Sequence, residues 1–322
     1  MRRIIVLGVL VAVAVLLSNV GAKSAQQPPR PSDLHVQVFD TRDNLYFVTG
    51  AGTNTLVLDG VKGVVVIDPK LPGLGHALLT AIAGVSEKPV TTIINTHAHV
   101  DHTGSNAEFP TGVEIIAHEN TKANMAKMDA FKGANAKFLP TRTFKDQMSL
   151  LDGPDRIDLY YFGAGHTDGD TIVVFPQKEL AYMGDLFADK SAPVIDRANG
   201  GSGIAYPETL ARAAAQIPGI GWVILGHRAI PSGYAISIAE LNRQRGVRLP
   251  PNYGTRGWLT WGDVREYADF TRDFRTAVQD AFNIGKSVDQ AAAALTLPEA
   301  YKGYGMERAK ADVQVIYDEL KQ

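Results

Sequence analysis

Short runs of β-branched and aromatic residues dominate the first part of the chain, and turn residues separate them. Four such runs, HVQVFD, NLYFVTG, NTLVLDG and GVVVIDP, lie between residues 35 and 69. This spacing predicts an antiparallel meander of strands. The stretch LPGLGHALLTAIAGV (71–85) then predicts a helix, and TTIIN (91–95) predicts another short strand.

A second block of strands and helices follows. VEIIAH, RIDLYYFG, DTIVVFPQ, ELAYMGD and GWVILGH predict strands, and ENTKANMAKMDAF and PETLARAAAQI predict helices. From about residue 257 the pattern is mostly helical. Two successive blocks of this kind predict an α/β (α+β) protein, with two sheets and helices outside them.

The N-terminus has a different pattern from the rest of the chain. Arg2 and Arg3 precede an apolar run from Ile4 to Leu17, and small and polar residues follow. This is typical of a secretory signal peptide, and the run is shorter than the roughly 20 residues of a membrane span. We expect a signal peptide over 1–24, a linker over 25–34, and a periplasmic or secreted protein without stable membrane association after cleavage. An uncleaved N-terminal anchor is the alternative.

Composition narrows the possible partners and ligands. The formal net charge of the 322 residues is −2, and no basic cluster of the kind that binds nucleic acid is present in the sequence. We therefore expect a small-molecule substrate and no nucleic-acid partner; the oligomeric state stays open. The chain contains no cysteine, so any metal must be held by His, Asp or Glu.

The stretch NTHAHVDHTG (95–104) gathers four side chains that can bind a metal, His97, His99, Asp101 and His102. His97 and His99 are two residues apart at the end of a predicted strand, so their side chains point to the same side. One tetrahedral zinc rarely takes four ligands from so short a stretch, which favours two adjacent metals.

Two metals need further ligands at other strand ends, and the sequence supplies three candidates. His166 lies in GAGHTDGD, Asp185 in AYMGDLF and His227 in WVILGHR. Each follows an apolar run and lies beside a glycine, which allows close approach of the backbone.

The motifs HAHVDH, GHTDG, MGDLF and LGHR, in this order and spacing, resemble the metal motifs of the metallo-β-lactamase superfamily. The resemblance implies an αββα sandwich over residues 35–248, with a C-terminal helical extension, 249–322, packed on it. It also implies one zinc held by His97, His99 and His166, a second held by Asp101, His102 and His227, and Asp185 bridging both. Such ligands also accept iron or manganese.

The residue at position 185 narrows the expected activity. One major group of true β-lactamases carries a cysteine at the position that matches Asp185, and another lacks the bridging carboxylate. The aspartate is more similar to that of glyoxalase II enzymes, lactonases and other di-metal hydrolases. We expect an exported di-zinc hydrolase in which a hydroxide shared by the metals attacks an ester, lactone, thioester or amide carbonyl. Asp101 would orient this nucleophile or take its proton.

Three alternatives to this activity remain open. They are a true metallo-β-lactamase, a glyoxalase II-like thioesterase, and a di-iron redox or non-catalytic metal-binding protein. Residues outside the metal motifs are also candidates for the site. We expect Asp68 to orient a ligand histidine, Thr167 to cap its loop or contact a ligand, and Asn199 to bind a substrate carbonyl.

Overall fold

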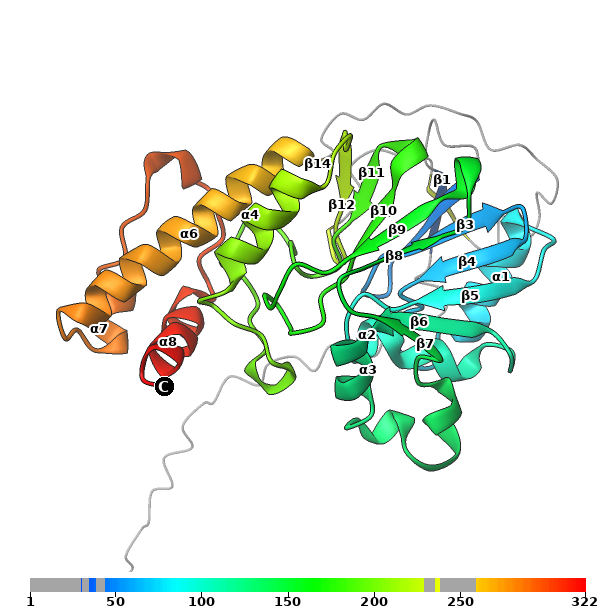
Figure 1. The fold of residues 1–322 in the computed structure, drawn as a ribbon, viewed down its shortest axis with the longest axis horizontal. Coiled ribbons are helices and arrows are strands. Elements are labelled where there is room, and N and C mark those ends of the chain that lie inside the picture. The colour runs from blue at the N-terminus through cyan, green and yellow to red at the C-terminus, as the bar shows by residue number, and fades with distance from the viewer. Residues whose placement is uncertain (1–29, 31–34, 39–43, 229–234, 238–258) are drawn as a thin grey trace, which may run out of the picture.

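The computed structural model describes residues 30, 35–38, 44–228, 235–237 and 259–322 (Figure 1). The predicted signal peptide, most of the predicted linker and the predicted boundary at residue 248 lie outside these residues, and they remain predictions. Within the described part of the chain, no helix is both long and apolar enough to cross a membrane.

The predicted meander forms the larger of two sheets. Its strand order is β13-β1-β2-β3-β4-β5-β6-β7; β1 to β4 are antiparallel, and β5, β6 and β7 continue the sheet in parallel. The strands of this sheet are β1 (His35–Val38), β2 (Leu45–Thr49), β3 (Thr55–Gly60), β4 (Gly63–Ile67), β5 (Val90–Ile94), β6 (Glu114–His118), β7 (Arg142–Phe144) and β13 (Ala235–Ser237).

The second sheet has the strand order β14-β12-β11-β10-β9-β8. Its strands are β8 (Gln147–Leu150), β9 (Ile157–Tyr160), β10 (Ile172–Phe175), β11 (Leu180–Tyr182), β12 (Trp222–Ile224) and β14 (Leu259–Thr260). The sequence pattern did not predict β7 and β8, because most of their residues are exposed and form no apolar run. These two strands lie at the same edge of the sandwich, where the chain passes from one sheet to the other (Figure 1).

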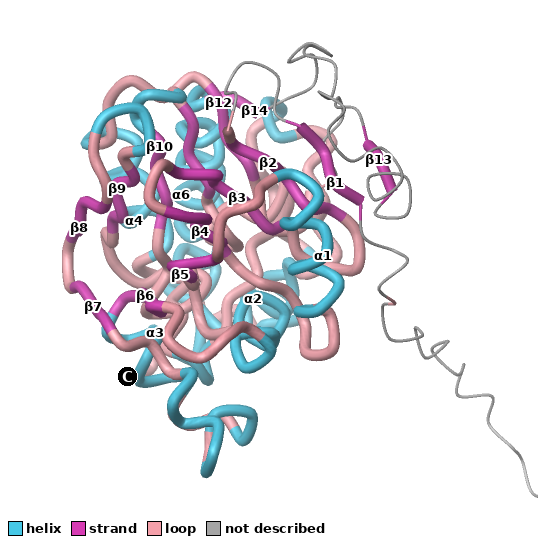
Figure 2. Tube along the Cα trace, turned by 90° about the vertical axis from the view of Figure 1, so that its right-hand side faces the viewer, coloured by secondary structure: helices cyan, strands magenta, loops and turns pink. Residues whose placement is uncertain are grey.

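Helices cover the outer faces of both sheets, and the predicted αββα sandwich is confirmed (Figures 1 and 2). α1 lies on the first sheet, whereas α4 and α6 lie on the second. The helices are α1 (Gly75–Val85), α2 (Val100–Thr103), α3 (Glu119–Met125), α4 (Tyr206–Gln216), α6 (Trp261–Asn283), α7 (Val288–Ala293) and α8 (Ala309–Leu320).

Strand β4 shows how one apolar run serves two hydrophobic layers. Side chains of a strand alternate between the faces of its sheet. Val64 and Val66 pack in the layer beneath α1, whereas Val65 and Ile67 pack between the sheets. All four are buried, so this strand reads as continuously apolar in the sequence.

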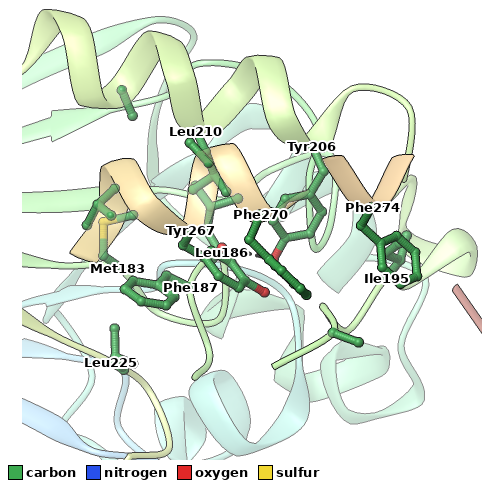
Figure 3. Close-up of a cluster of buried hydrophobic side chains, with 14 of the residues drawn as sticks. Met183, Leu186, Phe187, Ile195, Tyr206, Leu210, Leu225, Tyr267, Phe270 and Phe274 are labelled. Atoms are coloured by element: carbon green, nitrogen blue, oxygen red, sulfur yellow. Dashed lines mark hydrogen bonds between the residues drawn. The ribbon is translucent and has the colours of Figure 1, made fainter. Parts of the chain in front are cut away.

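The C-terminal helices share a core with the second sheet. Tyr267 and Phe270 of α6 pack in one cluster with Leu186, Tyr206 and Leu210 (Figure 3). The strand before α6, β14, pairs antiparallel with β12 in the second sheet. This segment therefore contributes to the same hydrophobic core that supports the loops around Leu186.

Candidate metal centre

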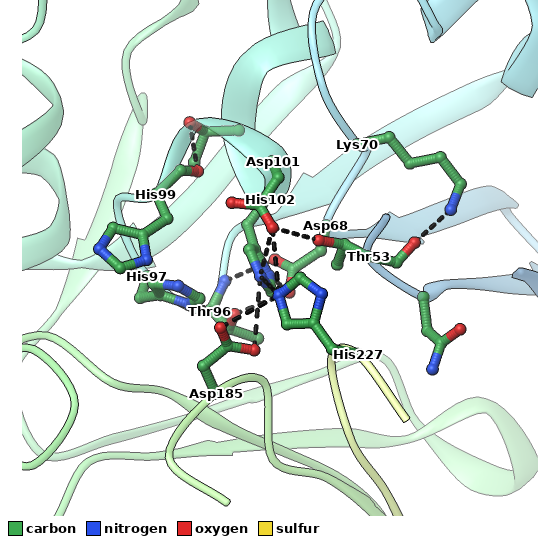
Figure 4. Close-up of polar contacts among 12 residues, drawn as sticks. Thr53, Asp68, Lys70, Thr96, His97, His99, Asp101, His102, Asp185 and His227 are labelled. Atoms are coloured by element: carbon green, nitrogen blue, oxygen red, sulfur yellow. Dashed lines mark hydrogen bonds and ion pairs between the residues drawn. The ribbon is translucent and has the colours of Figure 1, made fainter. Parts of the chain in front are cut away.

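The seven predicted metal ligands come together in the loops where strands of both sheets end. Figure 4 shows six of them, all except His166. They form two groups, and within each group the candidate ligand atoms lie within 4.8 Å of one another. The first group is His97, His99, His166 and Asp185; the second is Asp101, His102 and His227.

Hydrogen bonds orient the ring of His97. Its Nδ1 lies 3.1 Å from the Thr96 hydroxyl, and this hydroxyl lies 2.7 Å from Asp68 Oδ2. Because the hydroxyl donates its one hydrogen to the carboxylate, it accepts from the Nδ1–H of His97. The Nε2 atom therefore carries a lone pair, and it is buried without a hydrogen-bond partner. Such an orphaned acceptor fits a metal ligand.

The other two histidines of the first group are oriented in the same way. His166 donates from Nδ1 to the Val194 carbonyl at 2.7 Å, and His99 uses Nε2 to contact Asp196 Oδ2 at 2.7 Å. The remaining nitrogens, His99 Nδ1 and His166 Nε2, lie 3.1 Å apart. Both carry lone pairs in these tautomers, so a shared cation would remove their repulsion.

In the second group, Asp68 contacts one candidate ligand, His102. His102 Nδ1 donates to Asp68 Oδ2 at 2.7 Å, which leaves its Nε2 as the available ligand atom. This Nε2 lies 3.4 Å from His227 Nε2, and His227 Nε2 lies 3.1 Å from Asp101 Oδ2. Asp68 therefore fixes the ring of one candidate ligand from the side away from the centre.

Asp185 lies between the two groups. Its Oδ1 is 3.5 Å from His102 Nε2, and its Oδ2 is 3.2 Å from His227 Nε2 and 3.9 Å from His166 Nε2. Oδ1 is buried and has no hydrogen-bond partner. This position fits the bridging role that the resemblance implies, and the donor set of neutral imidazoles and carboxylates fits divalent metals.

The two groups differ in protonation. Burial and the neighbouring histidines lower the pKa of His97 well below its usual value, and burial lowers the pKa of His166 to about 4. Burial also opposes the charged form of His227, but hydrogen bonds to Asp101 and Asp185 outweigh it and raise the pKa to about 9. At neutral pH His97 and His166 are thus neutral and ready to bind a cation, whereas His227 holds a proton.

Metal binding to the second group is therefore expected to release protons. Below about pH 9 His227 is protonated in the metal-free protein, so a metal must displace that proton. The affinity of the second group should rise as the pH increases toward 9, whereas His97 and His166 of the first group are already neutral over this range. Calorimetric titration at pH 7.5 in buffers of different ionisation enthalpy measures the released protons. Binding of both metals without proton release would contradict this prediction.

The sequence motifs do not predict a role for Asp196. They predict Thr167 as a loop cap or ligand contact and Asn199 as a contact of a substrate carbonyl. Asp196 Oδ2 accepts from Asn199 Nδ2 at 2.6 Å, so the amide of Asn199 already holds the partner of His99. Thr167 Oγ1 donates to Asp170 Oδ1 at 2.5 Å, which matches the loop-capping alternative. Asp196 has no signal in the sequence, because nothing local distinguishes it from other loop aspartates.

Replacing Asp196 by Ala is expected to weaken metal binding by His99. The change removes the acceptor that fixes its ring, and loss of such an outer partner typically costs about 10–100-fold in metal affinity. Competition with a chromogenic chelator measures the dissociation constant. Asp196→Asn keeps an oxygen that can accept from His99 Nε2–H, so it should recover part of the affinity. Equal affinities of Asp196→Ala and the natural protein would refute the role.

The comparison with protein families identifies the chain. The model of the metallo-beta-lactamase superfamily matches residues 48–247, and the chain belongs to that superfamily. This confirms the resemblance seen in the sequence motifs. Its described residues include His/Asp groups that could hold metal ions.

Curated relatives match part of the chain. The α subunit of 2,4-dinitroanisole O-demethylase from Nocardioides sp. (strain JS1661) is 34% identical over 45% of this chain and 44% of that protein. A metallo-beta-lactamase type 2 from Bacteroides fragilis is 29% identical over 43% of this chain and 53% of that protein. The chain spans about half the length of these relatives.

A solved structure extends the likeness of fold. The stereoselective inverting sec-alkylsulfatase Pisa1 from Pseudomonas sp. has a TM-score of 0.61 and 14% identity, and covers 89% of this chain and 50% of its own. At this identity the likeness concerns the fold alone.

Proposed function

We propose that this chain is a di-zinc hydrolase that cleaves an ester, lactone, thioester or amide carbonyl of a small molecule. The observation that carries the proposal is the pair of ligand groups that meet at Asp185. The site is also open to a substrate, because the side chains of His99 and His227 are 27% and 40% exposed. Buried structural zinc sites are closed, whereas catalytic ones leave a position open.

The chain's own residues would hold two metals through defined atoms. His97 Nε2, His99 Nδ1 and His166 Nε2 would bind one ion, and Asp101, His102 and His227 would bind the other, with Asp185 shared. Two divalent ions at these ligands would supply Lewis acidity, which lowers the pKa of a coordinated water to about 7 and polarises a carbonyl. Iron or manganese could take the same ligands.

Asp101 is suited to orient the water that attacks the substrate. Burial alone would raise the pKa of Asp101, but the hydrogen bond with His227 and the charge of His102 hold it well below its usual value. The carboxylate stays ionised at neutral pH and accepts a hydrogen bond from Thr53 Oγ1 at 2.7 Å. Its side chain is 23% exposed, so it reaches the space where a substrate would lie. Asp101 thus acts as a fixed hydrogen-bond acceptor facing the substrate.

The carboxylate at position 185 and the name of one relative set the substrates to test. Asp185 favours a hydrolase of esters, lactones or thioesters over a β-lactamase that uses a cysteine. The O-demethylase relative adds cleavage of an activated aryl ether as a second candidate activity. A panel should contain aryl esters, lactones, thioesters, a chromogenic cephalosporin and 2,4-dinitroanisole. Turnover of none of them by the zinc-loaded protein would contradict the proposed function.

We also propose that the chain is exported through its N-terminal segment. Support comes from the basic start and apolar run of residues 1–24. N-terminal sequencing of the protein from a periplasmic or medium fraction tests this, with a mature start near residue 25 as the expected result. A cytosolic protein that retains Met1 would contradict it.

A further inference from the structure

Lys70 is a completely buried lysine beside the metal centre (Figure 4). Its Nζ donates to the backbone carbonyl of Gly50 at 3.1 Å and to that of Thr53. Burying an ammonium group is costly unless its hydrogen bonds are satisfied. The fold thus uses this buried amine to hold two carbonyls of one loop.

That loop, residues 50–54, depends on such anchors for its shape. Gly50, Ala51 and Gly52 have successive positive φ angles of 82°, 51° and 99°. Ala51 is not a glycine, so its left-handed conformation is strained. The surrounding contacts must therefore fix the loop, and the bonds from Lys70 to both ends of the Gly50–Thr53 stretch do so.

The loop contacts the second ligand group from two sides. Thr53 Oγ1 donates to Asp101 Oδ2 at 2.7 Å. Asn54 donates from Nδ2 to the carbonyls of Leu225 and Arg228 at 2.9 and 2.8 Å, and from its backbone nitrogen to the carbonyl of Gly226 at 2.6 Å. The carbonyls of Gly226 and Arg228 directly flank His227, and that of Leu225 lies two residues before it. Thr53 and Asn54 thus fix both the carboxylate of Asp101 and the backbone that carries His227.

The first ligand group is oriented by other residues. Thr96 contacts His97, Asp196 contacts His99, and the Val194 carbonyl contacts His166. None of these contacts involves residues 50–54. A change in this loop should therefore affect the two groups unequally.

We propose that Lys70 is a positioning residue for the second metal. It pins residues 50–54 so that Thr53 and Asn54 hold Asp101 and His227 in ligand geometry. This inference rests on the proposed two-metal function. It assigns to Lys70 a role in the affinity and occupancy of one metal rather than in general stability.

The test measures the affinity of each metal separately. Equilibrium dialysis at buffered free zinc should give two zinc ions per natural chain. Lys70→Met should keep the first ion and bind the second about 10–100-fold more weakly, as expected when outer support of a ligand is lost. Thr53→Val removes only the hydroxyl that donates to Asp101, and it should also weaken binding of the second ion. In the double variant, the loss of affinity for the second ion should be smaller than the sum of the two single losses in binding free energy, because both changes act through Asp101.

Lys178→Met is the matched control. Lys178 is also buried, and its Nζ donates to Asn44 Oδ1 at 2.5 Å, away from the metal loops. This variant should lose stability but keep both zinc affinities. If Lys70→Met does not fold, Thr53→Val still tests whether the contact between this loop and Asp101 supports the second metal.

The outcomes distinguish the inference from the proposed function. A natural protein that binds fewer than two ions would refute the two-metal function itself. If the natural protein binds two, equal weakening of both ions in Lys70→Met, or unchanged binding of the second ion in Thr53→Val, would overturn the role of Lys70.

Discussion

Asp185→Ala is expected to remove hydrolysis while leaving the sandwich folded. Its carboxylate oxygens lie 3.2–3.9 Å from His102, His166 and His227, so one change removes a ligand from both groups. The rate should fall by more than the ~10²–10³-fold that loss of a single transition-state donor costs. Steady-state hydrolysis of the best substrate in the panel, together with zinc content, measures the effect.

Two further variants sharpen this prediction. His99→Ala removes a ligand of the first group only, so it should reduce bound zinc without removing all of it. Asp129→Ala changes a side chain that is 95% exposed and should alter neither zinc content nor rate. A folded Asp185→Ala protein with full activity would contradict the bridging role.

Asp68→Ala is expected to destabilise the fold and to weaken the second metal. Asp68 is buried and accepts hydrogen bonds from the Thr96 backbone nitrogen at 2.8 Å, from the Thr96 hydroxyl at 2.7 Å and from His102 Nδ1 at 2.7 Å. Removing one partner of a buried ionic pair costs about 3–5 kcal/mol. Urea denaturation of the metal-free protein should show a loss of this size in the free energy of unfolding.

The matched control for Asp68 lies on the neighbouring strand β3. Asp59 contacts Ser86 at 2.8 Å and Lys88 at 3.1 Å, and its side chain is 20% exposed. Asp59→Ala should cost about 0–1 kcal/mol, as surface ion pairs do. An Asp68→Ala protein as stable as Asp59→Ala, with unchanged zinc affinity, would contradict the role of Asp68.

The clustering of the seven candidate ligands could be predicted from the sequence because its signals are local. An apolar run followed by glycine and histidine, as at His166 and His227, indicates a strand that ends at a loop. The two-residue spacing of His97 and His99 indicates a shared side. Asp68 could be predicted for the same reason, since it follows the buried strand β4 directly.

The supporting residues could not be predicted because their roles depend on contacts across the fold. Asp196 lies 97 residues from His99, and Thr53 lies 48 residues from Asp101. Lys70 follows a proline and resembles any surface lysine in the sequence; its burial and its hydrogen bonds to residues 50–54 depend on the fold. The helical pattern predicted α6 and α8 but not which face of which sheet they cover, since that depends on tertiary packing.

Metal content measured alongside hydrolysis tests the two-metal account most directly. The purified protein should contain two zinc ions per chain by mass spectrometry of the elements, lose both ions and its activity under a strong chelator, and regain activity in proportion to the second ion added. Hydrolysis that persists in the metal-free protein, or full activity with one ion per chain, would contradict the account.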